Sequence, residues 1–143
     1  HGTELWRTDG TAVGTTLVKD ISPGETDTSF RFGPVLGGEL LFAANDKMRG
    51  LELWKSDATE SGTTLVADIF EGESGSDVSF LGVVGTKAAF AARDASHGTE
   101  LWCTDGTTAG TYLVRDLRNG NDSSGPSNGA IHQGSLYFQA DGG

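Results

Sequence analysis

The stretch that decides the fold is Glu4-Leu5-Trp6-Arg7-Thr8-Asp9-Gly10-Thr11, because it returns twice at a spacing of 48 residues. The second copy reads Glu52-Leu53-Trp54-Lys55-Ser56-Asp57-Ala58-Thr59, and the third reads Glu100-Leu101-Trp102-Cys103-Thr104-Asp105-Gly106-Thr107. Later pairs keep the same register, namely Leu17-Val18, Leu65-Val66 and Leu113-Val114. A fixed period of this length is typical of repeat architectures. The sequence therefore predicts three units, 1–48, 49–96 and 97–143.

Each unit contains four strand-like runs rich in β-branched and aromatic residues, separated by turn residues. In the first unit these runs are roughly 4–8, 16–21, 30–36 and 39–44. The two-residue junctions between apolar runs fit tight hairpin turns, for which glycine supplies positive φ; they are Gly37-Gly38, Gly85-Thr86 and Gln133-Gly134. No segment shows a sustained apolar stripe of helical period, so we expect almost no helix.

Strands such as Leu40-Leu41-Phe42 carry apolar side chains at adjacent positions, and hence on both faces. A strand of this kind needs a packed sheet on each side. The predicted fold is therefore all-β: a β-propeller built from four-stranded antiparallel blades, with three blades in this chain and thus an incomplete ring. A β-solenoid is the rival, but its coils are usually shorter than 48 residues.

The motif Glu-Leu-Trp-x-x-Asp-Gly-Thr resembles the ELWxxDGT repeat family of bacterial proteins, and the resemblance covers the whole chain three times. The middle copy departs at Ala58, which replaces glycine, and at Leu51, which replaces a small polar residue. The family is associated with large secreted or cell-surface proteins whose repeats look propeller-like. The resemblance thus implies an extracellular or cell-surface location, and it attaches no catalytic residues to this chain.

Charge and composition exclude several function classes. The 143 residues carry a formal net charge of −10, which disfavours binding to nucleic-acid phosphates and to anionic membranes. No apolar run approaches the ~20 residues that a membrane span needs. Cys103 is the only cysteine, so an intrachain disulfide is excluded. The chain starts at His1 in mid-motif, which indicates a mature or excised segment.

The recurring acids, which include Glu4, Glu52 and Glu100 as well as aspartates, could indicate catalysis or a metal, but their recurrence in every unit favours a structural role in turns. We expect them to form turns and cap backbone donors at Asp9, Asp57, Asp105, Asp20, Asp68 and Asp116. No cofactor is expected. Calcium is the one ion that Asp carboxylates and loop carbonyls around Asp46 and Asp94 would suit, although no EF-hand or nonapeptide calcium pattern is present.

The candidate ligand-binding residues are Trp6, Trp54, Trp102, His1, Arg49 and His97. The tryptophans could stack on sugars, but their leucine neighbours favour packing between blades. His1, Arg49 and His97 share one repeat position, where a solvent-facing basic residue of a connecting loop is the favoured interpretation. Cys103 replaces Arg7 and Lys55, so its position is expected to be semi-exposed.

Three blades cannot close a propeller, which needs about four to eight. An open stack leaves apolar faces and strand edges exposed at both ends. Three solutions remain open: a symmetric pair of chains giving six blades, which is favoured; further repeats of a longer chain; or head-to-tail growth into a filament.

The function predicted from these features is that of a non-catalytic extracellular structural or adhesion scaffold that completes itself by self-association or belongs to a longer array. The alternatives are a multivalent carbohydrate-binding lectin and a filament-forming subunit. No Ser-His-Asp order, phosphate loop or zinc-ligand spacing occurs, so we do not expect an enzyme. The expected partners are copies of the chain or glycans, with no nucleic acid and no membrane insertion.

Overall fold

The computed structural model describes residues 2–24 and 27–143, and within that part it contains twelve strands and no helix. The first six strands are β1 (Leu5–Arg7), β2 (Thr16–Lys19), β3 (Phe30–Leu36), β4 (Glu39–Asn45), β5 (Leu51–Ser56) and β6 (Thr64–Ala67). The others are β7 (Ser79–Val84), β8 (Lys87–Ala92), β9 (Glu100–Thr104), β10 (Tyr112–Arg115), β11 (Ser127–His132) and β12 (Ser135–Gln139). The prediction of an all-β chain is confirmed. None of the described residues forms a helix that could span a membrane.

The strands form four antiparallel sheets, and these are displaced by half a repeat from the predicted units. Two sheets have four strands, in the orders β3-β4-β5-β6 and β10-β9-β8-β7, and the others are the hairpins β1-β2 and β11-β12. Each four-stranded sheet takes two strands from one predicted unit and two from the next. The boundaries between 1–48, 49–96 and 97–143 therefore fall in the β4–β5 and β8–β9 connections, in the middle of these sheets. The lengths of the connections explain which strands share a sheet. Five residues (46–50) join β4 to β5, whereas ten (20–29) join β2 to β3, and strands joined by a short connection tend to pair.

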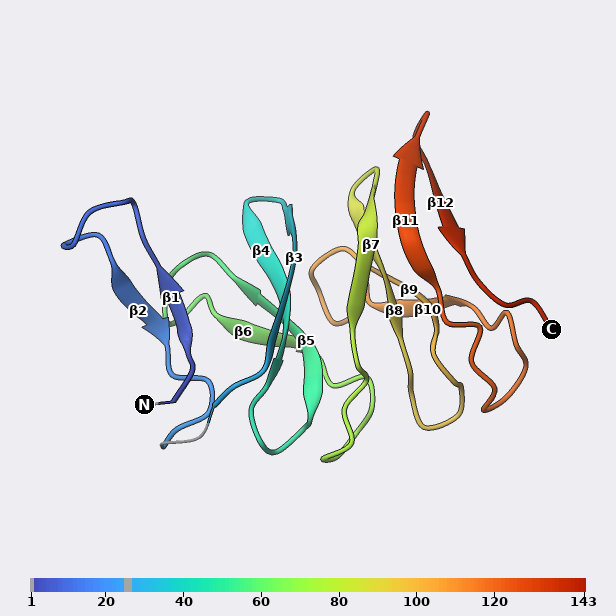
Figure 1. The fold of residues 1–143 in the computed structure, drawn as a ribbon, viewed down its shortest axis with the longest axis horizontal. Coiled ribbons are helices and arrows are strands. Elements are labelled where there is room, and N and C mark those ends of the chain that lie inside the picture. The colour runs from blue at the N-terminus through green and yellow to red at the C-terminus, as the bar shows by residue number, and fades with distance from the viewer. Residues whose placement is uncertain (1, 25–26) are drawn as a thin grey trace.

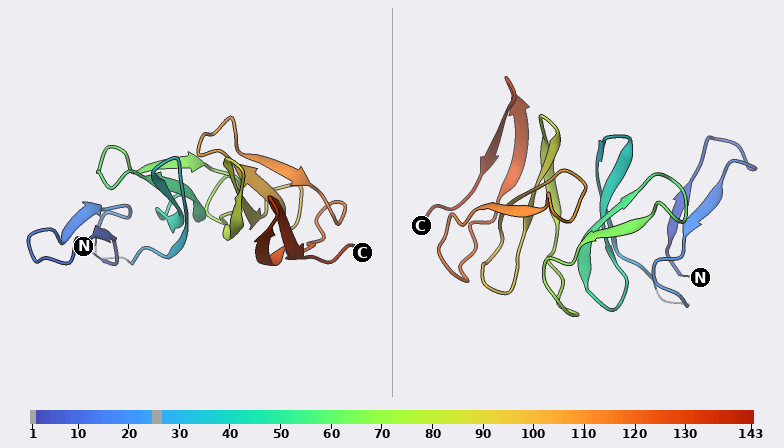
Figure 2. Two further views of the ribbon diagram at one scale, coloured as in Figure 1. Left: turned by 90° about the horizontal axis from the view of Figure 1, so that it is seen from above. Right: turned by 180° about the vertical axis from the view of Figure 1, so that it is seen from behind.

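The sheets stand side by side in a row, with the β1-β2 hairpin at one end and the β11-β12 hairpin at the other (Figure 1). Seen from above, the row is bowed, with the two termini at opposite ends (Figure 2, left). Strand β7 contacts β3 on one side and β11 and β12 on the other. The row does not close on itself, so the propeller arrangement and the number of blades remain predictions.

Two apolar layers hold the row together, each between neighbouring sheets. In the first layer Leu5 and Val18 of the β1-β2 hairpin share a buried cluster with Phe42 and Trp54 of the next sheet. In the second, the opposite face of that sheet meets the β7–β10 sheet, through Leu53, Val66, Phe90 and Trp102. Burying one such side chain stabilises the fold by about 1.5–3 kcal/mol. The adjacent apolar positions of the strands thus serve two layers at once.

The predicted hairpin junctions adopt positive φ in the structure. Gly37 and Gly38 have φ of 61° and 90°, and Gln133 and Gly134 have φ of 49° and 76°. At the middle junction Gly85 has φ of 59°. Glycine reaches this region without a steric cost, so these turns follow from local chemistry.

Ala58 gives a direct measure of this local cost. Its φ is 69°, while Gly10 and Gly106 at the same repeat position have φ of 90° and 89°. We expect Ala58→Gly to stabilise the chain by about 0.5–1 kcal/mol, because relief of left-handed strain outweighs the added freedom of the unfolded chain. Gly106→Ala should destabilise the chain by a similar amount. Denaturant titration of both variants measures these changes in the free energy of unfolding, and a change of the opposite sign at each site would contradict the expectation.

Candidate functional site

The loops joining β1 to β2, β5 to β6 and β9 to β10 repeat one structure built around an aspartate. Oδ1 of Asp9 accepts hydrogen bonds from Thr11 N at 2.9 Å and from Thr11 Oγ1 at 2.7 Å. The same pair of contacts recurs between Asp57 and Thr59 and between Asp105 and Thr107. The hydrogen bond from the threonine hydroxyl, followed by that from its backbone N–H, lowers the pKa of each of these carboxyls. The carboxylates therefore shape their own loops.

A glycine in each loop makes room for this carboxylate. A Cβ atom added to Gly14 would lie 2.0 Å from Asp9 Oδ1, and Gly62 and Gly110 are confined in the same way by their own aspartates. The backbone N–H of Gly14 donates to Thr11 Oγ1 at 2.9 Å. The recurring Gly-Thr of the sequence is therefore explained by close packing within the loop.

Two of these loops also bind the sheet that precedes them. Lys19 Nζ in β2 donates to the carbonyl oxygens of Glu60 and Thr63 in the second loop, at 3.2 and 2.8 Å. Thr108 Oγ1 in the third loop donates to Val66 O in β6 at 2.6 Å. The first loop, 8–15, lies at the end of the row, with no sheet before it in this chain.

The glutamate of each motif is buried and ties its strand to the connection that follows the sheet. Glu52 is fully buried, and its carboxylate accepts from Ile69 N at 2.9 Å, from Ser76 N at 2.7 Å and from Ser76 Oγ at 2.7 Å. Glu100 repeats this with Leu117 N, Ser124 N and Ser124 Oγ. Glu4 accepts from Ile21 N at 2.8 Å. A buried carboxylate survives only with such donors.

The sequence did carry a signal for this arrangement. Glu52 stands between Leu51 and Leu53 in β5, and Glu4 and Glu100 likewise precede the Leu-Trp of their own units. A recurring charge inside an apolar strand indicates a buried, hydrogen-bonded ion rather than a solvent-facing turn residue. The expectation of turn-forming acids agrees with the loop contacts of Asp9, Asp57 and Asp105, and it missed the buried position of the glutamates.

Burial raises the pKa of Glu52 to about 7, although hydrogen bonds from Ser76, Ile69 and Phe70 favour its charged form. The folded chain therefore binds this proton more tightly than the unfolded chain, and stability falls as the pH rises from about 5 towards 8. The difference amounts to roughly 3 kcal/mol. We expect the free energy of unfolding of Glu52→Gln, measured by chemical denaturation at several pH values, to fall less between about pH 5 and 8 than that of the unchanged chain. An equal fall in both proteins would contradict the raised pKa of Glu52.

The three candidate tryptophans have different surroundings. Trp54 and Trp102 are only 7% and 9% exposed, whereas Trp6 is 58% exposed. The Trp54 ring stacks on Phe42 with 6.5 Å between ring centroids. Two of the three indoles are thus held in the apolar layers and cannot stack on a ligand, and Trp6 is the one whose face reaches solvent.

The basic candidates are paired with acids of their own loops. Arg49 contacts Asp46, and its Nε lies 3.5 Å from Oδ2 of Asp68. His97 Nδ1 lies 2.9 Å from Oδ1 of Asp94, and this hydrogen bond raises the pKa of His97. His1 lies outside the described residues.

The remaining predicted acids lie just after the outer strands of the sheets. Asp116 accepts from Gly120 N at 3.2 Å, and Asp20 occupies the equivalent place after β2. Asp46 and Asp94, the calcium candidates, each accept two backbone N–H groups of their own loops. Across residues 2–24 and 27–143, no group of three or more His, Cys, Asp or Glu side chains could hold a metal ion.

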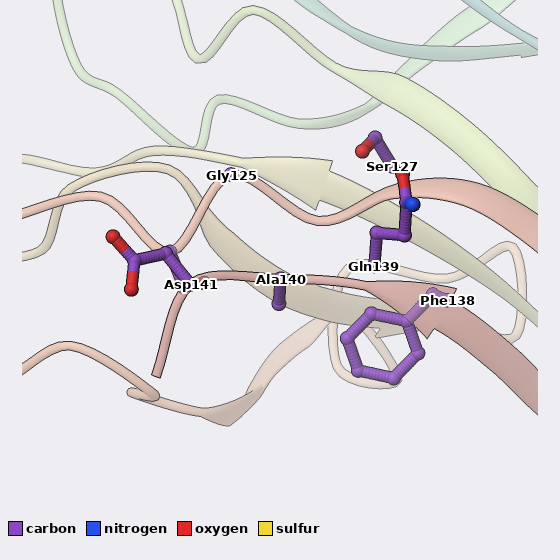
Figure 3. A pocket seen from close by; sticks show the side chains of 7 residues that line it. Gly125, Ser127, Phe138, Gln139, Ala140 and Asp141 are labelled. Carbon is purple, nitrogen blue, oxygen red and sulfur yellow. The ribbon is translucent and has the colours of Figure 1, made fainter. Parts of the chain in front are cut away.

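Hollows lie at the ends of the row and between its sheets. One of about 490 Å³ lies beside the end of β12 and is lined by Phe138, Gln139, Ala140 and Asp141 together with Ser124, Gly125 and Ser127 (Figure 3). Another, of about 190 Å³, adjoins β1 and is lined by Leu5, Trp6 and Arg7 together with Val35 and Leu40. A third, of about 590 Å³, lies between the hairpin turns of the two four-stranded sheets. The first two adjoin unpaired strand edges, which makes these edges the candidate interaction site.

Cys103 in β9 is half-buried, and burial raises the pKa of its thiol, so the thiolate is disfavoured at neutral pH. This thiol therefore gives no support for a nucleophilic role of Cys103.

Comparison with known proteins adds no relative to this description. No protein-family model, no curated protein and no solved structure matches the chain. The candidate site therefore rests on the geometry of the chain itself, and the resemblance to the ELWxxDGT repeat family stays a prediction.

Proposed function

We propose that the chain is a non-catalytic scaffold or adhesion module of an extracellular or cell-surface protein, with its sheets acting as the blades of a propeller that this chain leaves incomplete. The observation that carries the proposal is the use of the recurring polar groups. Glu52 and Glu100 accept hydrogen bonds from the connections between sheets. Asp9, Asp57 and Asp105 accept hydrogen bonds within their own loops. Groups that are engaged in this way support a fold and leave little for catalysis.

Unlike side chains must converge on one site for catalysis, and repeated sheets supply them poorly. The basic candidates Arg49 and His97 support the same interpretation, because each is neutralised by an aspartate of its own loop. The chain therefore presents a set of similar loops on a row of packed sheets. A scaffold needs this kind of surface.

The lectin alternative is favoured by one observation only, the exposed side chain of Trp6, a residue that lines one hollow together with Arg7, Ser56 and Asp57. An aromatic face next to hydrogen-bonding groups is a common sugar platform. The burial of Trp54 and Trp102 argues against one such platform in each repeat.

A glycan array and a panel of glycoside, ester and polysaccharide-lyase substrates separate these functions. We expect no turnover and no glycan binding by the purified chain. Glycan binding that Trp6→Ala abolishes, and that Met48→Ala leaves intact, would favour the lectin. Turnover above the buffer rate would contradict the scaffold.

A further inference from the structure

We infer that the β12 edge of one copy of this chain pairs with the β1 edge of a second copy, so that β11, β12, β1 and β2 form a four-stranded sheet shared between two chains. This inference rests on the proposed scaffold function and names its partner. An unpaired strand edge is a template for the addition of another strand. Here β1 and β12 each have a partner on one side only, at opposite ends of the row.

The chain contains two examples of the joint. Strand β4 pairs with β5, and β8 pairs with β9, in the same antiparallel register relative to the repeat. Strand β12 occupies the repeat position of β4 and β8, and β1 occupies that of β5 and β9. The hairpins β11-β12 and β1-β2 are thus the two halves of one such sheet.

Shifting the internal register by the repeat length gives the register of the joint. Phe42 faces Trp54, and Phe90 faces Trp102, so Phe138 is expected to face Trp6 of the second copy. Leu41 faces Lys55, which places Tyr137 opposite Arg7. Each residue of the joint then repeats a pairing that the chain already makes.

Three apolar side chains near the two ends are exposed although their repeat counterparts are buried, and this joint would cover them. Trp6 is 58% exposed, although Trp54 and Trp102 at its repeat position are buried. Val114 is 44% exposed, although Val18 and Val66 are buried. Tyr137 is 59% exposed, although Leu41 and Ala89 are buried. Trp6 lies in β1 at the N-terminal end of the row, whereas Val114 in β10 and Tyr137 in β12 lie toward its C-terminal end, so the surfaces are complementary rather than identical.

The joint would also repeat a polar contact that the chain makes between neighbouring sheets. Lys19 in β2 reaches forward to the carbonyl oxygens of Glu60 and Thr63 in the next Asp loop. Arg115 in β10 occupies the repeat position of Lys19 and is exposed. In the joint it would donate to the carbonyl oxygens of Ala12 and Thr15 of the second copy, which occupy the positions of Glu60 and Thr63.

The joint is head-to-tail, and the two ends of each chain are different. Two copies can therefore make two equivalent joints and close as a ring with a two-fold axis, while an angle that does not close would extend the row. The hollow lined by Phe138, Gln139, Ala140 and Asp141 adjoins the end of the strand to which β1 would add (Figure 3).

Sedimentation and light scattering of the 143-residue chain test the inference. A closed pair has a mass of about 30 kDa, twice the 14.9 kDa of one chain. We expect association that Trp6→Arg, Val114→Arg or Tyr137→Arg weakens about tenfold or more each, because a charge would be buried at an apolar joint. Met48→Arg is the matched control, since Met48 is 63% exposed and lies in the β4–β5 loop away from both ends. All four side chains are exposed in the single chain, so folding is unaffected, which circular dichroism checks.

Cross-linking tests the register. In a Cys103→Ser background, a copy with Arg7→Cys mixed with a copy carrying Tyr137→Cys should form a disulfide-linked pair under mild oxidation. Met48→Cys mixed with Tyr137→Cys should not. A larger species that the three edge variants disperse also supports the joint.

Two results would overturn it. A chain that stays monomeric at all concentrations would leave these edges to other repeats or other partners, and association that is insensitive to the edge variants would place the contact elsewhere. A monomer without turnover would contradict the joint but not the proposed scaffold function. Turnover by an associated chain would contradict the scaffold function but not the joint.

Discussion

Replacing Glu52 with alanine is expected to lower the free energy of unfolding by about 3–5 kcal/mol. The carboxylate is fully buried and accepts the backbone N–H groups of Ile69 and Ser76 and the hydroxyl of Ser76. Alanine would leave these donors buried without an acceptor and would open a cavity between β5 and the connection to β7.

Urea titration followed by tryptophan fluorescence measures this loss, with Glu39→Ala as the matched control. Glu39 forms an ion pair with Lys55 at 2.9 Å, and both side chains are partly solvent-exposed. Its removal should change stability by less than about 1 kcal/mol. Equal losses for the two variants would show that the buried position of Glu52 has no special role. The loss of stability for Glu52→Gln is expected to lie between those of these two variants, because the amide oxygen of glutamine can still accept some of the hydrogen bonds.

The second large effect is expected for Phe90→Ala, at about 3–5 kcal/mol. Phe90 in β8 is fully buried in the layer between the two four-stranded sheets, where it shares a cluster with Leu53 and Trp102. Its ring lies 6.1 Å from that of Phe80. Truncation would remove contacts to both sheets and loosen the row at its centre.

Phe32→Ala is the control for this truncation, because Phe32 in β3 is 63% exposed while still contacting the rings of Phe30 and Phe42. A loss below about 1 kcal/mol is expected there. If thermal unfolding showed the two variants to be equally destabilised, the apolar layer would not be the source of cohesion between sheets.

Much of the local structure could be predicted from the sequence because it depends on residues close together in the chain. The run predicted at 30–36 coincides with β3, and the run at 39–44 falls within β4. The positive φ at Gly37 and Gly134 follows from tight turn geometry. The contacts of Asp9 with Thr11 involve neighbours two residues apart, as the chemistry of aspartate in turns leads one to expect.

The phase of the sheets could not be taken from the period, because a 48-residue repeat looks the same wherever its boundary is drawn. The length of the connections was the available signal: five residues between β4 and β5 favour a hairpin across the boundary of the first two units. The unlike surroundings of Trp6, Trp54 and Trp102 were also hidden, because the three copies of the motif are nearly identical in sequence.

The sequence by itself determined the repeat, the all-β character and the turns, since these follow from side-chain periodicity and from backbone preferences that act over a few residues. Only the tertiary structure decided which strands pair, which glutamates and tryptophans are buried, and which edges remain open. The physical reason is that burial depends on what stands on the far side of a sheet. Trp54 and Trp102 have a preceding sheet within the chain that covers them, and Trp6 has none.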